Sequence, residues 1–357
     1  MVRPHRLSAV FLFFFFFCSG FMVAENIQFL REVLLQENSF LLEKPASFVK
    51  TKDGSFIIAD FQAGDLKIFR PSGEILKTFG RKGRGPGDFL GPFSLSYCYP
   101  RLGLVDIDRR MVFIMKVGCA GDVRIVDEFK CPGGITRISL SREKAVLAGY
   151  LVDGHGVSSS IFQYIFSSCK KVPVFSNFEI YGYSSHKEYE KKRINEIIPL
   201  GLRVLCCQKD DAVFGLWDKR LRILKKEIRS GEVILFGKRT ANFQPGKITK
   251  AVKTAYKKRD QKKLREEEKK TSFIMNVAVT GNLFLLFYKN ENPEKYFMQV
   301  YNQSGNFIKE VLLPSRFEGG FLFVSENEKV FYELICDDRT MELKFRIRAY
   351  GFDFSSR

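Results

Sequence analysis

Carboxylate side chains beside short apolar runs are the first residues in this sequence that could do chemistry. Four aspartates occupy such places, namely Asp60, Asp65, Asp106 and Asp108. Carboxylate and carbonyl oxygens are the ligands that Ca²⁺ takes in proteins, so these residues could hold calcium. Aspartate at a strand end more often caps a turn, and we favour that interpretation. We keep the four aspartates as candidate ligand-binding residues and predict no catalytic residue, no metal site and no required cofactor.

A glycine-rich loop is the second candidate site. Residues 80–89 read GRKGRGPGDF, with Arg81, Lys82 and Arg84 among the glycines. Successive backbone N–H groups beside basic side chains can hold a phosphate or a carboxylate. The run lacks the Gly-Lys-Ser/Thr ending of a P-loop, and glycine also supplies the positive φ that a tight connection needs. We favour a structural connection here and keep Arg81 and Arg84 as candidate ligands of an anion.

Histidine is too scarce for several common catalytic sites. Beyond the N-terminal segment the chain has only His155 and His186. A zinc site with three histidines is therefore excluded within one mature chain, and neither an H-E-x-x-H nor a G-x-S-x-G motif is present. Trp217 is the only tryptophan, which excludes carbohydrate stacking on several indoles. An enzyme is therefore less well supported than a binding protein.

The first 24 residues predict export. Arg3 and Arg6 precede an apolar run over residues 7–24, which is typical of a secretory signal peptide. The run is also long enough to persist as a signal anchor. Cys18 could be lipidated, although Phe17 stands where the lipoprotein motif has a small residue. We expect an exported protein that is periplasmic, on the outer surface or membrane-anchored.

Export would place the remaining cysteines in an oxidising compartment. Seven cysteines follow Cys18, and none of them forms a C-x-x-C motif. We expect most of them to behave as small buried hydrophobic residues. Cys98 and Cys119 fall within one repeat and are candidates for a bridge.

Paired turn motifs recur along the rest of the chain and predict the fold. A polar turn opens a short apolar run, and a second turn with a central glycine follows about twenty residues later. The pairs are Asp53-Gly54 with Ser72-Gly73, Gly103 with Ala120-Gly121, Asp210-Asp211 with Ser230-Gly231, and Thr280-Gly281 with Ser304-Gly305. Repetition of four short strands at roughly forty residues is typical of a β-propeller.

The repeat predicts an all-β fold over residues 27–357, a six-bladed β-propeller of four-stranded antiparallel blades. The strand expected at 29–37 has no blade of its own, and the last blade lacks one strand. We therefore expect the N-terminal strand to complete the last blade, because closing the ring removes free strand edges. Two stretches interrupt the period, residues 176–199 and 246–271, and we treat both as insertions.

The second insertion concentrates much of the chain's net charge of +18. Residues 247–270 hold eleven Lys and Arg against four acids. Such a segment can associate with an anionic membrane surface by electrostatics alone. We predict no specific recognition of nucleic acid, and we expect a monomer.

The stretch from Pro45 to Pro92 resembles an NHL-type repeat. It has a D-G turn, an apolar strand that ends in Ala59-Asp60, the run LKIF, an S-G turn and then Phe79-Gly80. The loop at 80–89 is similar to the G-x-x-G-x-G-P-G-E/D-F signature of bacterial exported six-bladed β-propeller proteins, many of them lipoprotein-like. The resemblance covers roughly fifty residues strongly and implies a propeller on the outer side of a membrane. It implies no activity, because a fold does not fix a function.

The function that we favour is binding. A rigid ring can present a protein, peptide or glycan site on its loops and at the mouth of its central channel. The alternative is a metal-assisted hydrolase or lactonase-like enzyme that uses carboxylates at the channel. Four or more convergent Asp, Glu or Asn side chains at one mouth would favour the enzyme. An apolar or basic mouth would favour the binding protein.

Overall fold

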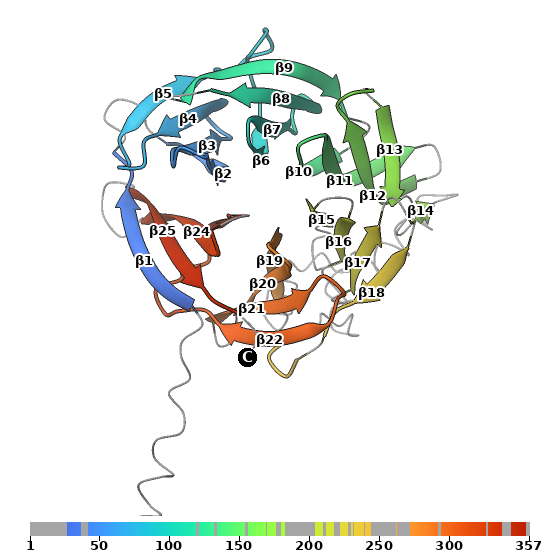
Figure 1. Cartoon of the computed structure of the whole chain (residues 1–357). Coiled ribbons are helices and arrows are strands. Elements are labelled where there is room, and N and C mark those ends of the chain that lie inside the picture. Colours follow the sequence, from blue (N-terminus) through green and yellow to red (C-terminus); the bar gives the residue numbers. More distant parts are fainter. Residues whose placement is uncertain are drawn as a thin grey trace, which may run out of the picture.

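The chain folds into a β-propeller. The computed structural model describes most of residues 27–354; residues 37–41, 183–203, 244–261, 263–271 and some shorter stretches lie outside the described part. The described strands form six antiparallel sheets. Figure 1 shows these sheets arranged around a common centre, as the sequence predicts. Among the described residues, no helix is long and apolar enough to cross a membrane.

The sheets follow one another along the chain, and the N-terminal strand β1 (Ile27–Leu34) belongs to the last of them. The first comprises β2 (Pro45–Lys50), β3 (Phe56–Asp60), β4 (Asp65–Phe69) and β5 (Ile75–Phe79). The second comprises β6 (Pro92–Cys98), β7 (Arg101–Asp106), β8 (Met111–Val117) and β9 (Val123–Lys130). The third comprises β10 (Gly134–Leu140), β11 (Lys144–Asp153), β12 (Gly156–Ile165), β13 (Lys170–Phe175) and β14 (Ile180–Gly182). The fourth comprises β15 (Val204–Lys209), β16 (Ala212–Trp217), β17 (Arg222–Glu227) and β18 (Val233–Phe236). The fifth comprises β19 (Phe273–Thr280), β20 (Leu283–Glu291), β21 (Glu294–Asn302) and β22 (Phe307–Leu312). The last comprises β23 (Phe321–Val324), β24 (Val330–Asp337), β25 (Lys344–Phe352) and β1.

Five sheets are four-stranded blades of the expected kind, and the third sheet is different. Its strand β12 is longer than its neighbour β13, which pairs only with residues 161–165 of β12. The beginning of β12 would present a free edge, and β14 covers it by pairing with Gly156–Ser158. The expectation of four strands in every blade is therefore wrong for this sheet, because an exposed strand edge favours an added strand.

The N-terminal strand closes the ring, as the sequence predicts. β1 pairs antiparallel with β25, so the last blade takes three strands from the C-terminal end and one from the N-terminal end. Two arginines of β25 reinforce the closure. Glu32 lies 3.0 Å from the Arg346 guanidinium and 2.7 Å from that of Arg348. The C-terminal strand β25 is therefore paired on both sides, with β24 and with β1.

The innermost strands contact one another around the ring in the order β2, β6, β10, β15, β19, β23 and back to β2. Serine side chains bridge three of these strands. Ser47 Oγ of β2 accepts a hydrogen bond from the N–H of Leu95 in β6, at 3.1 Å. Ser96 Oγ of β6 accepts one from the N–H of Leu140 in β10, at 2.9 Å. These bonds use strand edges that would otherwise face the centre of the ring unpaired.

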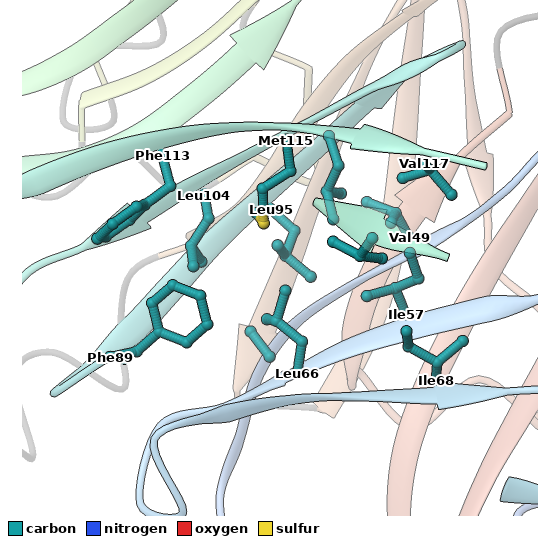
Figure 2. Packing of buried hydrophobic residues seen from close by; sticks show 13 residues of the cluster. Val49, Ile57, Leu66, Ile68, Phe89, Leu95, Leu104, Phe113, Met115 and Val117 are labelled. Atoms are coloured by element: carbon teal, nitrogen blue, oxygen red, sulfur yellow. The ribbon is translucent and has the colours of Figure 1, made fainter. Parts of the chain in front are cut away.

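The hydrophobic core lies between neighbouring blades. Figure 2 shows one cluster, in which Ile57, Leu66 and Ile68 of the first blade meet Leu104 and Met115 of the second. All five side chains are fully buried, and complete burial of such a side chain contributes about 1.5–3 kcal/mol. The strands of this pair of blades, β9 included through Val123, contribute to such contacts, which leaves the loops at the two faces to carry polar groups.

Candidate functional site

The candidate residues gather on the face of the ring at which the innermost strands begin, which we name the upper face. Loops that precede a blade, and turns between its second and third strands, lie on this face because alternate strands run in opposite directions. The opposite, lower face carries the turns between first and second strands. The glycine-rich loop and all four predicted aspartates belong to the upper face.

Asp60, the last residue of β3, is fully buried and holds the segment that leads into the first blade. Its carboxylate accepts hydrogen bonds from the N–H groups of Glu43 (2.6 Å) and Lys44 (3.0 Å). The buried Lys67 ammonium lies 3.2 Å from Asp60 and 2.9 Å from Asp65. Burial acts to raise the pKa of Asp60, but the backbone donors and Lys67 hold that pKa below its ordinary value. Burial raises the pKa of Asp65, which Lys67 only partly offsets.

Asp106 performs the same task in the second blade. It ends β7, is fully buried, and accepts hydrogen bonds from the N–H groups of Leu90 (2.8 Å), Gly91 (3.0 Å) and Arg109 (2.9 Å). Asp108, two residues further on, is exposed instead. The contacts of Asp60 and Asp106 support the turn-capping interpretation, and Asp108 is the predicted aspartate that faces solvent.

A third acid of this kind lies in the last blade, where the sequence analysis did not look for one. Glu333 is fully buried in β24 and accepts hydrogen bonds from the N–H groups of Glu318 (2.9 Å) and Gly320 (3.0 Å) and from the Tyr350 hydroxyl (3.1 Å). Burial raises the pKa of Glu333 despite these donors. A glutamate inside the apolar run VFYELIC was the signal that could have identified it.

The glycine-rich loop between β5 and β6 contains its own anion. The Asp88 carboxylate accepts a hydrogen bond from the N–H of Gly85 at 3.1 Å and lies 3.2 Å from Arg81 Nε. A Cβ atom on Gly83 or Gly85 would lie less than 3.0 Å from Asp88 Oδ2, so these two glycines make room for the carboxylate. The N–H of Gly83 bonds to the carbonyl of Phe89. These contacts favour a structural connection over a phosphate cradle.

The basic side chains of the loop remain on the surface. Arg81 is 84% exposed in spite of its ion pair with Asp88, and Arg84 is exposed. Lys82 donates to the carbonyl of Gln62 at 3.3 Å, which joins the loop to the turn after β3. The Arg109 guanidinium donates to the carbonyl oxygens of Gly85 and Asp88. The structure thus brings Arg81, Arg84 and Asp108 to one surface, above the buried Asp60 and Asp106.

Next to this surface lies a row of alternating cations and phenyl rings that the sequence analysis missed. We name Lys44, Phe61, Phe93 and Arg137 the cation–aromatic row. Lys44 Nζ lies 5.4 Å from the centre of the Phe61 ring, the two ring centres lie 6.4 Å apart, and Arg137 Cζ lies 5.5 Å from the centre of the Phe93 ring. Cations within about 6 Å of a ring face are attracted to it. None of the four side chains is fully buried.

Three blades supply the row, which explains why no local motif reveals it. Lys44 and Phe61 flank the first two strands of the first blade, while Phe93 and Arg137 belong to the innermost strands β6 and β10. Phe93 is the extra residue of a β-bulge, since Pro92 pairs with Asp106 and Ser94 with Val105. A bulge changes the direction of a side chain relative to its neighbours. The same irregularity follows Pro45, Ile135 and Ile274 in three other innermost strands.

A second polar cluster that the sequence did not reveal joins the fourth and fifth blades. Glu310 of β22 accepts hydrogen bonds from the hydroxyls of Thr240 (2.5 Å) and Tyr288 (2.6 Å) and from the amides of Gln299 (2.8 Å) and Asn242 (2.6 Å). Burial acts to raise the pKa of Glu310, but the four donors hold it below its ordinary value. Burial and Glu310 together raise the pKa of Tyr288. This cluster fixes the segment that leaves the fourth blade.

Several predictions fall outside the described residues, and they stay predictions. They concern lipidation of Cys18, the bridge from Cys98 to Cys119, His155 and His186, the signal segment 1–24, and most of the insertions at 176–199 and 246–271. Within the part of the chain that the structure describes, no group of three or more His, Cys, Asp or Glu is placed to hold a metal ion.

The fold and the loop contacts together define a protein of the β-propeller class. No family model matches the sequence, and no curated protein matches it. Solved structures match the fold. A Bacteroides fragilis protein, provisionally described as exported, has a TM-score of 0.60 at 12% identity, over 93% of this chain and 97% of that one. A Bacteroides vulgatus member of the DUF4221 family has a TM-score of 0.58 at 10% identity, over 93% and 100%. The WD40 repeats of RRP9 have a TM-score of 0.51 at 10% identity, over 91% and 99%.

Proposed function

We propose that this chain is an exported six-bladed β-propeller with NHL-like blades that binds a protein, peptide or glycan on its upper face. The five-stranded sheet occupies one position of the ring, so we count it as a blade beside the five regular ones. The cation–aromatic row is the observation that carries the proposal. Aromatic and arginine side chains are enriched where proteins bind partners, and here they come together from three blades at one face.

The polar groups of this face support binding over catalysis. A channel enzyme would need carboxylates free to hold a metal or a water molecule. Asp60 and Asp106 instead use their oxygens on backbone N–H groups, and Asp65 shares the Lys67 ammonium with Asp60. The side chains that remain at the surface are mainly basic and aromatic, which is the arrangement that we expect of a binding protein.

The test of binding is an array of peptides and glycans probed with the wild-type chain and with Phe93→Ala. We expect hits of the wild type to be lost in Phe93→Ala, because this change removes the ring that joins both halves of the row. Tyr99→Ala is the matched control, since Tyr99 is an aromatic residue of the lower face with 55% exposure. Hits that survive in Phe93→Ala and disappear in Tyr99→Ala would refute the proposal.

Export is the second part of the proposal, and the basic and apolar N-terminal segment supports it. The similar Bacteroides fragilis fold is described as exported, which agrees with it. Intact mass and N-terminal sequencing of the protein from its native host test this part. A mature chain that begins after residue 24, or at a lipidated Cys18, is the expected result. A full-length chain recovered from the cytosolic fraction would contradict it.

A further inference from the structure

The upper face around the cation–aromatic row carries an excess of positive charge. Residues 43–45, 60–67, 80–93, 106–110 and 137 include eight cations and six acids, of which Lys67, Asp60 and Asp106 are buried. One of the acids, Asp88, is taken up by Arg81 and by the N–H of Gly85. Lys82 is exposed and donates to a neutral backbone carbonyl, so its positive charge persists at the surface, whereas Arg109 is half-buried beneath the loop. A partner that fits this face must supply negative charge.

The geometry of the row restricts what kind of anionic partner fits. A pyranose ring stacks on an open, flat aromatic face, and a cation already takes one face of each ring of the row. Lys44 lies over one ring and Arg137 over the other, and the two rings meet edge to face at an interplanar angle of 81°. The row therefore presents a positive charge at each end and the edges of two phenyl rings between these charges. Carboxylate and aliphatic side chains complement such a surface better than a sugar does.

The spacing of the row also suits an extended chain. Its neighbouring members lie 5.4, 6.4 and 5.5 Å apart. Alternate side chains on one face of an extended strand lie roughly 6.6 Å apart. A peptide with acidic, apolar, apolar and acidic side chains at alternate positions therefore matches the order cation, phenyl, phenyl, cation.

We propose that the upper face binds an acidic polypeptide segment in extended conformation, with two carboxylates on Lys44 and Arg137 and two aliphatic side chains on Phe61 and Phe93. This inference rests on the proposed binding function and names the chemical class of the partner. Acidic glycans and anionic membranes present charge without the alternating aliphatic side chains.

The experiment measures binding of a fluorescent peptide, ESLSLSE, to the full chain by anisotropy. We expect the analogue QSLSLSQ to bind at least about tenfold more weakly, and the affinity for the acidic peptide to fall as ionic strength rises. Arg137→Gln and Lys44→Gln should each weaken binding of ESLSLSE about tenfold and should hardly change that of QSLSLSQ. Equal binding of the two peptides by the wild type would overturn the inference.

Lys52→Gln is the matched control variant, because Lys52 is a cation of the lower face that lies 4.6 Å from the centre of the Tyr99 ring. Its binding should equal that of the wild type. Thermal unfolding of each variant shows whether the fold is intact, and Lys44→Gln should unfold with the wild type because Lys44 is exposed. Arg137 is half-buried, so binding by Arg137→Gln is measured at a temperature at which its unfolding curve shows the variant to be folded.

Two further probes separate failure of this inference from failure of the proposed function. Oligogalacturonate and vesicles that contain phosphatidylserine present carboxylate or phosphate without a polypeptide. Binding of either one that Arg137→Gln weakens more than it weakens peptide binding would overturn the polypeptide class and leave the binding function intact. If none of the probes, and none of the array hits, depends on Phe93 or Arg137, both the inference and the proposed function are wrong.

Discussion

Two connections between blades, one before β6 and one after β18, are both held by carboxylates. The two cases differ in how far the carboxylate lies from the connection along the sequence. In the glycine-rich loop, Asp88 accepts a hydrogen bond from Gly85, three residues away. Asp106, in the blade into which the loop leads, accepts hydrogen bonds from Leu90 and Gly91. In the second connection, Glu310 holds Thr240 and Asn242 from about seventy residues away in sequence. The first connection is fixed locally and the second by tertiary structure.

The difference teaches where function can be placed on such a ring. The first connection is held through its backbone groups, which leaves side chains such as Arg81 and Arg84 exposed. The second connection is held through its own polar side chains, since Thr240 and Asn242 donate to Glu310. We therefore look for the binding site beside the first connection, and we regard the Glu310 cluster as structural.

The largest effect should follow Asp106→Ala, which removes the carboxylate that holds the first connection. Three backbone N–H groups lose their acceptor, and an unsatisfied buried donor costs about 1–3 kcal/mol. We expect the free energy of unfolding to fall by about 3 kcal/mol or more, measured by urea denaturation. Asp108→Ala, at an exposed position two residues away, should change it by less than about 0.5 kcal/mol. Equal losses in the free energy of unfolding for the two variants would show that the buried hydrogen bonds of Asp106 do not determine its contribution to stability.

The second largest effect should follow Glu310→Gln, which tests the long-range attachment. An amide is neutral and supplies one acceptor oxygen where the carboxylate supplies two, so all four donors lose a charged partner and at least one is left without an acceptor. We expect a loss of about 2 kcal/mol, with Glu232→Gln as the control at an exposed glutamate. A loss at Glu232 as large as that at Glu310 would contradict the special role of the cluster.

The pH dependence of Glu310→Gln sharpens the same test. The pKa of Glu310 lies below its ordinary value of 4.5, so the folded state binds this proton less readily than the unfolded state does. The stabilisation is therefore complete above pH 4.5 and is lost as the pH falls through the lowered pKa. The difference in stability between wild type and variant should shrink on acidification. A difference that grows toward low pH would mean that the sign of the pKa shift is wrong.

Local and long-range contacts also explain how far the sequence could predict this molecule. Glycine turns and short apolar strands are local features. They were sufficient to predict the propeller, its closure by β1 and the structural role of the loop at 80–91. The row was not predictable, because Phe61, Phe93 and Arg137 come from three blades and meet only through the register of their strands. β14 was missed for a related reason, since it pairs only with an edge that the length of β12 creates.

A smaller effect should distinguish two reasons for glycine within the first connection. Gly83 has too little room for a Cβ atom beside Asp88, whereas Gly87 has open space but a φ of +77°. Each Gly→Ala change should cost about 1 kcal/mol. Asp88→Ala should relieve the cost at Gly83 in a double-mutant cycle and leave the cost at Gly87 unchanged. If Asp88→Ala relieves both costs or neither, the carboxylate does not set the requirement at Gly83.

The smallest effect on stability should follow Arg81→Gln. Arg81 is 84% exposed, and surface ion pairs contribute between zero and about 1 kcal/mol, while Asp88 keeps its bond to the N–H of Gly85. We expect the free energy of unfolding to change by less than about 0.5 kcal/mol. The same variant removes one positive charge from the upper face, so the salt dependence of peptide binding should become shallower. A large loss of stability would mean that Arg81 belongs to the attachment of the loop, and the contrast between a connection held through its backbone and one held through its side chains would no longer hold.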